Sequence, residues 1–564
     1  MMSFFYSYRR SLFVGVLTAL FILIATGIAL RKSNTWDEPA HILSGYAYLA
    51  KGMDYIAPVN HPVLGRAITA AFPWLFLDLS IDETIEPEGA KDSRFIPYSV
   101  KFLYENKAGA DDILFLSRLG NILLAALLAI YVYIWSSRLW GATGAFLSLF
   151  FFILCPNMLA NASIATTDLP ITAFFFITSY YLFRTAEEGV STVKTIAASV
   201  FFTFALASKH TAFLLIPFIP LAYLFAARKD GARKLVTHLG FFILLSYTAL
   251  WAVYGFRFHS SAAGYTAPEW GIFPPTGLTP LFAFIRDYRL LPESYLLGVV
   301  GSIAGAEIGK PTFFMGEYSS STGWFSYFPV AFLIKTPIPA LILLAASVVY
   351  LTQESVKRRR ALMLMLPAIL VFLVFTLERV NIGLRHILPV YPFLFTLIGF
   401  VPSIRTKSEK LARAVFYTCM VWYAYAASLV YPHQLAYFNE FIGGPKNGYR
   451  YLVDSNLDWG QDLLGLKEYV GRKGIKKIKL AYFGLSDPAY FGIDYQYMPS
   501  YLILKARDYE PDIELKGWFA ISATMLQGVY LPDHDFYAVF RNIEPVEKIG
   551  YSIFVYRLGV DEGQ

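Results

Sequence analysis

The sequence predicts a mainly α-helical, polytopic integral membrane protein with about eleven transmembrane helices and a small C-terminal α/β domain. Of its 564 residues, 56% are hydrophobic and 16% are charged, against roughly 25% charged residues in an ordinary soluble domain. The mean hydropathy of +0.47 agrees with a membrane protein. Apolar runs of about 20 residues, the length a helix needs to cross a bilayer, recur along the chain. This composition excludes collagen-like, disordered and disulfide-scaffold classes.

The first apolar run follows Arg9-Arg10, which resembles the start of a signal peptide. Its length exceeds the roughly 7–15 residues of a signal-peptide core, so we expect a retained span.

Cys155 and Cys419 both lie within apolar runs, and we expect no disulfide. The expected spans lie at about 11–30, 113–135, 142–160, 169–183, 195–208, 211–227, 237–256, 325–351, 361–377, 386–402 and 411–431.

Lysine and arginine collect in alternate short loops, which sets the expected orientation. Clusters such as Arg228–Lys234 and Lys357–Arg360 place the N-terminus in the cytoplasm. An odd number of spans then places the C-terminus outside. The outer loops would be 31–112 and 257–324, within a transmembrane module of residues 1–440 that precedes an extracytoplasmic domain of residues 441–564.

The tail beyond about residue 445 has the composition of a soluble domain. Strand-like runs occur at Ile478–Phe483, Trp518–Thr524 and Tyr551–Arg557. The tail carries 14 basic and 16 acidic residues, a net charge of −2, so the total of +7 leaves +9 on the membrane part. The basic surplus therefore serves topology and lipid contact, and nucleic-acid binding has no support.

Two adjacent carboxylates, Asp37 and Glu38, follow the first span beside an interfacial tryptophan. His41 comes shortly after them, and His61 follows within an Asn-His-Pro motif; both are possible substrate contacts. The alternative is a solvated acidic cap before a helix that begins at a proline. Other charged groups expected on the same side of the membrane favour a functional role.

A third carboxylate, Asp168, is expected at the outer end of the fourth span. It could also be the N-cap of that span, with Pro170 in the first turn. Between spans five and six, Lys209 interrupts an apolar stretch at the outer surface. This lysine could anchor the chain by reaching lipid headgroups, or it could hold a bound phosphate.

Further basic residues are expected on this face. Arg385 and His386 open the tenth span, and Lys335 lies within an apolar run. A lysine at that depth costs a few kcal/mol, so it should face a cavity or an anion. Acids and bases on one face suit a reaction in which a carboxylate deprotonates a hydroxyl while cations hold a phosphate leaving group.

The sequence contains no nucleotide-binding glycine motif and no His/Cys metal spacing, so we expect no cofactor and no metal. An enzyme acting on the outer face has no access to cytosolic nucleotide sugars. Its activated donor would therefore have to be linked to a lipid.

Several motifs resemble those of the GT-C superfamily of polyprenyl-phosphate-dependent glycosyltransferases. These are the loops around Asp37 and Asp168, Ser208-Lys209, and the segment Leu384–Pro389. The protein O-mannosyltransferases and the lipid A aminoarabinose transferases are the nearest groups. The segments Leu291–Gly298, Tyr327–Pro337, Tyr437–Asn439 and Asp454–Asp462 resemble prokaryotic phospholipid-carrier-dependent glycosyltransferases.

This resemblance implies that Asp37 is the catalytic base, with Glu38 and Asp168 also at the catalytic centre and with inversion at the anomeric carbon. It implies that Lys209 and Arg385 hold the donor phosphate, to which we add His386 and Lys335. Asp454 and Asp458 could contact substrate, or their segment could be a structural turn and helix cap.

The sequence thus predicts an inverting glycosyltransferase of the plasma (cytoplasmic) membrane, whose partners are a polyprenyl-phosphate-sugar donor, a hydroxyl acceptor and the bilayer. The acceptor could be a lipid, a glycan or a protein, although no MIR-repeat domain of the protein mannosyltransferases is evident. One alternative is a metal-dependent enzyme similar to the oligosaccharyltransferases. Another is a transporter or flippase of lipid-linked sugars, against which the expected charges cluster at one face rather than along the midplane.

Overall fold

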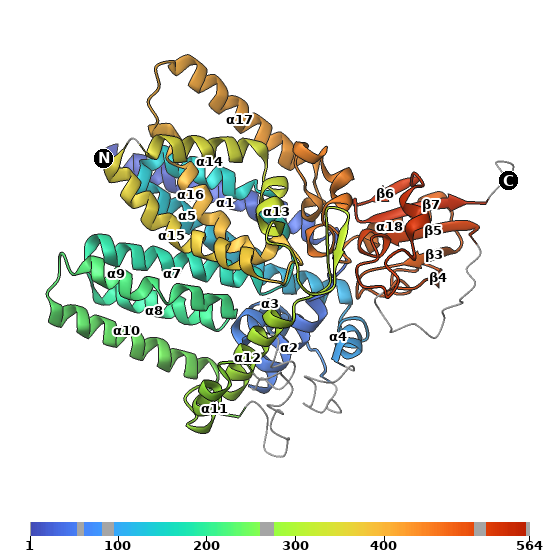
Figure 1. Cartoon of the computed structure of the whole chain (residues 1–564), viewed down its shortest axis with the longest axis horizontal. Coiled ribbons are helices and arrows are strands. Elements are labelled where there is room, and N and C mark those ends of the chain that lie inside the picture. The colour runs from blue at the N-terminus through green and yellow to red at the C-terminus, as the bar shows by residue number, and fades with distance from the viewer. Residues whose placement is uncertain are drawn as a thin grey trace.

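A long helical bundle makes up most of the molecule, and a small sheet lies at one end of it (Figure 1). The computed structural model describes residues 2–52, 61–81, 95–259, 276–352, 354–500 and 515–559. The bundle contains α1 (Met2–Ala29), α5 (Ala110–Ile153), α6 (Pro156–Ala162), α7 (Asp168–Glu188), α8 (Thr192–Leu206), η1 (His210–Leu215), α9 (Phe218–Ala226), α10 (Ala232–Val253), α13 (Tyr327–Lys335), α14 (Ile338–Leu351), α15 (Ser355–Leu377), η3 (Leu384–Val390), α16 (Tyr391–Ile398), η4 (Val401–Ser403) and α17 (Glu409–Leu429).

Helices occupy the positions of the eleven expected spans, but not all of them are long enough to cross a bilayer unaided. Within the described ranges, five are long and apolar enough, namely Arg10–Ala29, Ala110–Ile153, Ala232–Val253, Ser355–Leu377 and Leu384–Ser403. A sixth results if α13 and α14, bent by 110° at a short break, count as one span. The expected spans 195–208 and 211–227 correspond to α8 and to η1 with α9, which are shorter than a full crossing.

The expected second and third spans form one continuous element, α5, which is kinked. Gly141 in its interior has φ 80° and ψ −177°, a left-handed conformation that side chains with a Cβ rarely adopt. This residue therefore separates two helical segments. The second segment ends at Ile153, earlier than expected, and α6 begins at Pro156 after a short break.

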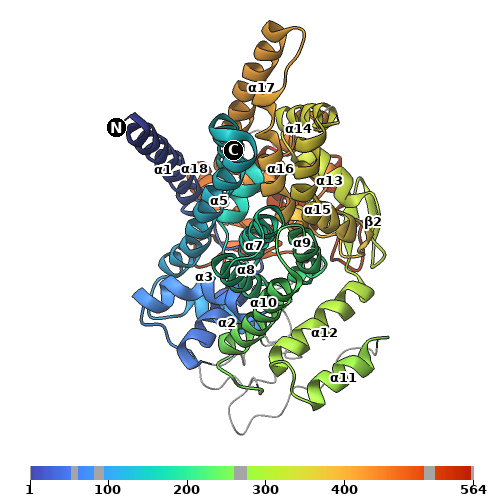
Figure 2. The same ribbon diagram turned by 90° about the vertical axis from the view of Figure 1, so that its left-hand side faces the viewer.

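Shorter helices lie along one side of the bundle, toward the end nearer the sheet (Figure 1), and Figure 2 shows α11 and α12 beyond α10. They lie largely in the expected outer loops, parts of which fall outside the described residues. The elements are α2 (Glu38–Lys51), α3 (Val63–Phe76), α4 (Phe95–Tyr104), α11 (Thr279–Asp287), α12 (Glu293–Ile308) and the hairpin of β1 (Thr312–Phe314) and β2 (Glu317–Ser319).

The C-terminal part contains a five-stranded mixed sheet in the order β4-β3-β5-β7-β6. The predicted strands are confirmed as β3 (Ile478–Ala481), β5 (Gly517–Ser522) and β7 (Ile553–Leu558), which form the centre of the sheet. The strand β3 is parallel to β4 and β5, whereas β7 is antiparallel to β5 and β6. The other elements are α18 (Leu463–Lys473), β4 (Tyr495–Tyr497), α19 (Ala523–Leu526), α20 (Ala538–Arg541) and β6 (Glu547–Ile549).

The loop after α1 is bound to a segment more than 400 residues later in the chain. The Ser33 backbone N–H donates to the Gln461 carbonyl (3.0 Å), and the Trp36 N–H donates to the Trp459 carbonyl (2.9 Å). Lys32 also forms an ion pair with the buried Asp462. These contacts fix the backbone immediately before Asp37.

Candidate functional site

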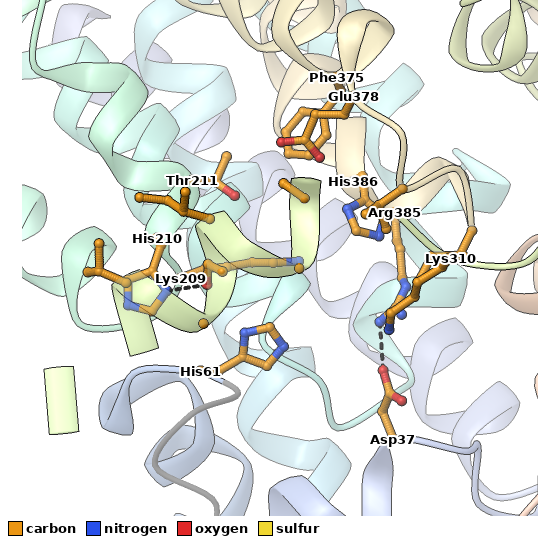
Figure 3. A pocket seen from close by; sticks show the side chains of 18 of the residues that line it. Asp37, His61, Lys209, His210, Thr211, Lys310, Phe375, Glu378, Arg385 and His386 are labelled. Carbon is orange, nitrogen blue, oxygen red and sulfur yellow. Dashed lines mark hydrogen bonds and ion pairs between the residues drawn. The ribbon is translucent and has the colours of Figure 1, made fainter. Parts of the chain in front are cut away.

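A cavity of about 690 Å³ lies between the bundle and the short outer helices. Its lining includes four basic side chains, two acidic side chains and four histidines. Figure 3 shows Lys209 and His210 on one side of the cavity and Arg385, His386 and Lys310 on the other. The charged and imidazole groups are Asp37, His41, His61, Arg66, Lys209, His210, Lys310, Glu378, Arg385 and His386.

Asp37 is the N-cap residue of α2, but its side chain makes no capping hydrogen bond. Its carboxylate instead accepts a hydrogen bond from Arg385 Nη1 (2.8 Å), and the side chain is 25% exposed to the cavity. Pro39 follows in the first turn, where a missing backbone N–H costs nothing. The backbone thus begins a helix while leaving the carboxylate available to a ligand.

Arg385 joins two carboxylates from distant parts of the chain. Besides Asp37, its Nη1 donates to Asp168 Oδ2 (3.3 Å), and Lys209 Nζ donates to Asp168 Oδ1 (2.6 Å). Asp168 is the first residue of α7, not its N-cap, and lies behind the cavity wall with almost no exposure. It therefore positions the two cations from behind. The Arg385 guanidinium also lies over the Trp459 ring, 4.2 Å from its centroid.

The protonation states of the cavity follow from burial and from these neighbours. Burial by itself would raise the pKa of Asp37, but the nearby Arg385, His41 and Lys310 outweigh it and hold that pKa below its usual range. Burial lowers the pKa of His41 to about 4, and it also lowers the pKa of His61 well below its usual value. At neutral pH the cavity therefore contains an ionised aspartate beside neutral imidazoles.

The imidazoles retain hydrogen-bonding capacity for a ligand. The rings of His41 and His61 lie against each other, with centroids 5.4 Å apart. Within the described part of the chain, the Nε2 atoms of His41, His210 and His386 are buried without a hydrogen-bond partner, as is Arg385 Nε. Buried polar atoms are usually paired, so these atoms indicate a site that a polar ligand completes.

Glu38 points away from the cavity, contrary to its predicted place at the catalytic centre. Its side chain is completely buried and forms a bidentate ion pair with Arg118, with both N–O distances 2.8 Å. The same carboxylate accepts hydrogen bonds from the backbone N–H groups of Thr35 (2.7 Å) and Ala165 (2.8 Å). It thus ties the loop before Asp37 to α5 and to the loop before α7.

Lys335 is buried as expected, but it faces neither the cavity nor an anion. Its ammonium donates to the backbone carbonyls of Leu435 (2.9 Å), Tyr437 (3.0 Å) and Asn456, and it lies 4.3 Å from the centroid of the Phe438 ring. Three carbonyl groups stabilise the ammonium without a bound anion. The structure therefore does not place Lys335 where it could bind the donor phosphate.

Asp454 and Asp458 do not line the cavity either. Asp454 accepts a hydrogen bond from the Tyr530 hydroxyl, and Asp458 Oδ2 accepts one from the Thr524 backbone N–H (2.7 Å). Burial raises the pKa of Asp458 to about 7. The segment that carries these two aspartates contacts the site through the Trp459 indole, which lies against Arg385, and not through either carboxylate.

The sequence did not predict four residues of the cavity lining, namely Arg66, His210, Lys310 and Glu378, nor Arg118 behind it. Arg118 could have been found, because it is a lone charge inside an apolar run, and such residues are paired or functional. Lys310 carried no comparable signal, since it belongs to a loop of ordinary polarity. Across the described ranges, no group of three or more His, Cys, Asp or Glu side chains is arranged to hold a metal ion.

Comparison with known proteins gives a family match over part of the chain. The family model of dolichyl-phosphate-mannose-protein mannosyltransferases matches residues 111–254, which comprise α5 to α10. This match confirms the resemblance stated from the motifs. It supports the assignment of the chain as a glycosyltransferase of the GT-C superfamily. No curated protein matches the chain.

Among solved structures, the chain is similar to ArnT from Cupriavidus metallidurans bound to undecaprenyl phosphate. The identity is 14% and the TM-score 0.49, with 96% of this chain and 97% of that chain covered. It is also similar to the oligosaccharyltransferase of Archaeoglobus fulgidus, at 10% identity and a TM-score of 0.40 over 74% of this chain and 57% of that chain.

Proposed function

We propose that this integral membrane protein is an inverting glycosyltransferase that moves a sugar from a polyprenyl-phosphate carrier to a hydroxyl acceptor. The observation that carries the proposal is the ion-pair chain in which Arg385 bridges Asp37 and Asp168 while Lys209 holds Asp168. It places one partly exposed carboxylate beside several cations in a single cavity. The family match over residues 111–254 supports the same reaction class.

The basic groups of the cavity suit the phosphate of a lipid-linked donor. Lys209, Lys310 and Arg385 all line it, and Arg385 can offer two parallel N–H donors to phosphate oxygens. A bound phosphate competes with the carboxylates for these cations. Arg385 lowers the pKa of Asp37. When the donor phosphate binds Arg385, this effect weakens, so Asp37 becomes a stronger base in the presence of the donor.

The proposed reaction is a single displacement. The acceptor hydroxyl oxygen forms a bond to the anomeric carbon, and its proton passes to the Asp37 carboxylate. The bond between that carbon and the phosphate oxygen breaks, and the electron pair leaves with the polyprenyl phosphate. Arg385, Lys209 and Lys310 stabilise the charge on the leaving group, and attack from the opposite side inverts the configuration.

The direct test replaces Asp37 by asparagine in full-length protein reconstituted in vesicles with a polyprenyl-phosphate sugar. We expect release of polyprenyl phosphate to fall by about 10²–10⁴-fold, the usual contribution of a general base. The matched control is Asp112→Asn, an exposed aspartate of the same predicted outer loop that lies outside the cavity lining. Near-normal turnover by folded Asp37→Asn protein would refute the proposal.

The orientation of the site is part of the same proposal. We propose that the cavity and residues 441–564 lie on the extracytoplasmic side of the plasma membrane, with the bundle of residues 1–440 in the bilayer. The same vesicles distinguish the alternatives. Donor translocation without bond cleavage would indicate a flippase, and activity that requires Mg²⁺ or Mn²⁺ would indicate an enzyme similar to the oligosaccharyltransferases.

A further inference from the structure

A second hollow, of about 380 Å³, lies between α4 and the C-terminal sheet, which are neighbours in Figure 1. Its volume is within the range of small-ligand sites. Five tyrosines line it: Tyr104 from α4, Tyr482 and Tyr490 from the loop between β3 and β4, and Tyr495 and Tyr497 from β4. We refer to it as the tyrosine groove.

The tyrosine rings offer both apolar faces and hydroxyl groups. Tyr490 is 41% exposed, and its ring meets that of Tyr104 edge to face, with centroids 4.9 Å apart. Tyr495 and Tyr497 are half-buried on β4. A tyrosine has an apolar body and a polar end, so a surface of several such rings suits a ligand that is itself apolar on its faces and polar around its edge.

The charges of the tyrosine groove distinguish it from the first cavity. Its charged lining groups are Lys101, Glu105 and Asp487, one basic and two acidic, and Ser486 and Ser500 add hydroxyls. Nothing here resembles the basic lining that suits a phosphate. The ligand should therefore be an uncharged molecule with many hydroxyl groups, and a pyranose has this chemistry, with C–H faces and an equatorial rim of hydroxyls.

Two residues of the groove wall bind the loop that carries the proposed base. The Tyr104 hydroxyl donates to Asn34 Oδ1, and Ser486 Oγ donates to the same atom at 2.8 Å. Asn34 is completely buried and lies three residues before Asp37. The wall of the tyrosine groove is thus hydrogen-bonded to the loop that leads to Asp37 in the first cavity.

We infer that the tyrosine groove binds a saccharide of one or two pyranose units that belongs to the acceptor. The assignment to the acceptor rests on the proposed function, since a glycosyltransferase needs such a substrate. The saccharide binding itself rests only on the groove. In this arrangement the groove holds a glycan next to the reaction site, while Asp37 takes the proton of its reacting hydroxyl.

The test measures binding of chitobiose, mannobiose and maltose to the full-length protein in nanodiscs, by saturation-transfer NMR without any donor. We expect at least one disaccharide to bind, and Tyr490→Ala to weaken that binding about tenfold, which corresponds to about 1.4 kcal/mol. Tyr490→Phe, which retains the ring, should weaken it much less. Tyr288→Ala removes an exposed tyrosine outside the groove and should have no effect.

Repeating the measurement with Asp37→Asn separates this inference from the proposed reaction. Unchanged, Tyr490-dependent binding in that variant supports the groove even if no sugar transfer is ever detected. The inference is overturned if none of the disaccharides binds, or if Tyr490→Ala binds them as the parent does. Binding of a proline- and tyrosine-rich peptide that is lost in Tyr490→Ala, without disaccharide binding, would overturn it in favour of a peptide site.

Discussion

Replacing Glu38 by glutamine tests whether Glu38 stabilises the fold or acts in the reaction, as we propose for Asp37. The Glu38 carboxylate accepts five hydrogen bonds, two from Arg118, two from Thr35 and one from Ala165. Glutamine turns one of the two acceptor oxygens into a donor that would face the N–H groups now bound there. It also leaves the Arg118 guanidinium, which is 1% exposed, without its counter-charge.

The magnitude follows from the burial of this pair. Removing one partner of a buried ion pair costs about 3–5 kcal/mol, because the remaining charge stays desolvated. The total free energy of unfolding of a typical protein is only about 5–15 kcal/mol. We therefore expect Glu38→Gln to lose a large fraction of the stability, with activity falling in proportion to the folded protein.

The assay is denaturant unfolding in mixed micelles, followed by tryptophan fluorescence, together with turnover per folded molecule. Asp37→Asn is the matched comparison, because it makes the same chemical change one residue earlier. Its side chain is partly exposed and its partner Arg385 retains Asp168, so we expect its stability to change by less than about 1 kcal/mol.

A particular result would show this reasoning to be wrong. If Glu38→Gln unfolds like the parent yet loses turnover per folded molecule as Asp37→Asn does, the Glu38 carboxylate acts in the chemistry. A double variant, Glu38→Gln with Arg118→Gln, adds a second check. It should recover part of the lost stability, because neither charge then remains buried without a partner.

Four further outcomes are expected. Lys335→Met should lower the stability by about 1–3 kcal/mol by leaving carbonyls unpaired, without changing the donor concentration needed for half-maximal rate. Burial raises the pKa of Asp458 to about 7 in the folded protein, against about 3.9 unfolded, so stability should fall as pH rises from about 4 to 7, and Asp458→Asn should flatten this dependence in unfolding titrations. Chelation with EDTA should leave turnover largely intact, and a requirement for Mg²⁺ would contradict this. In a background without Cys155 and Cys419, cysteines at Glu88, Asp112 and Asp533 should react with an impermeant thiol reagent from outside, whereas one at Arg359 should not; Glu88 lies outside the residues that the structure describes.

The helices and central strands could be predicted from sequence because they follow local patterns. Apolar runs predict where helices lie, and alternating residues predict β3, β5 and β7. Two breaks within apolar runs had local signals, namely Gly141 within α5 and Pro337 between α13 and α14. The angle of the bend between α13 and α14, 110°, could not be predicted, because packing against neighbouring helices sets it.

The candidate site was predictable in composition but not in detail. Acids and bases expected on one face do meet, and Asp37, Asp168, Lys209 and Arg385 form one chain of ion pairs. The direction in which each side chain points depends on partners far away in the chain. Lys335 binds three carbonyls at least 100 residues later in the chain, whereas its depth in an apolar run had predicted a cavity or an anion.

The contacts between the loop after α1 and the segment around Trp459 have a consequence for biosynthesis. Ser33 Oγ donates to the Gly460 carbonyl, a partner 427 residues later. At about 5–20 residues per second, a ribosome needs about 20–85 s to make the intervening chain. During that time most of the helices have been inserted, and Glu38 already has its partners Arg118 and Ala165, but the loop that carries Asp37 still lacks its contacts to Trp459, Gly460 and Gln461. This loop is therefore completed only near the end of translation, and a chain that stops before residue 459 lacks that part of its support even if its helices are already inserted.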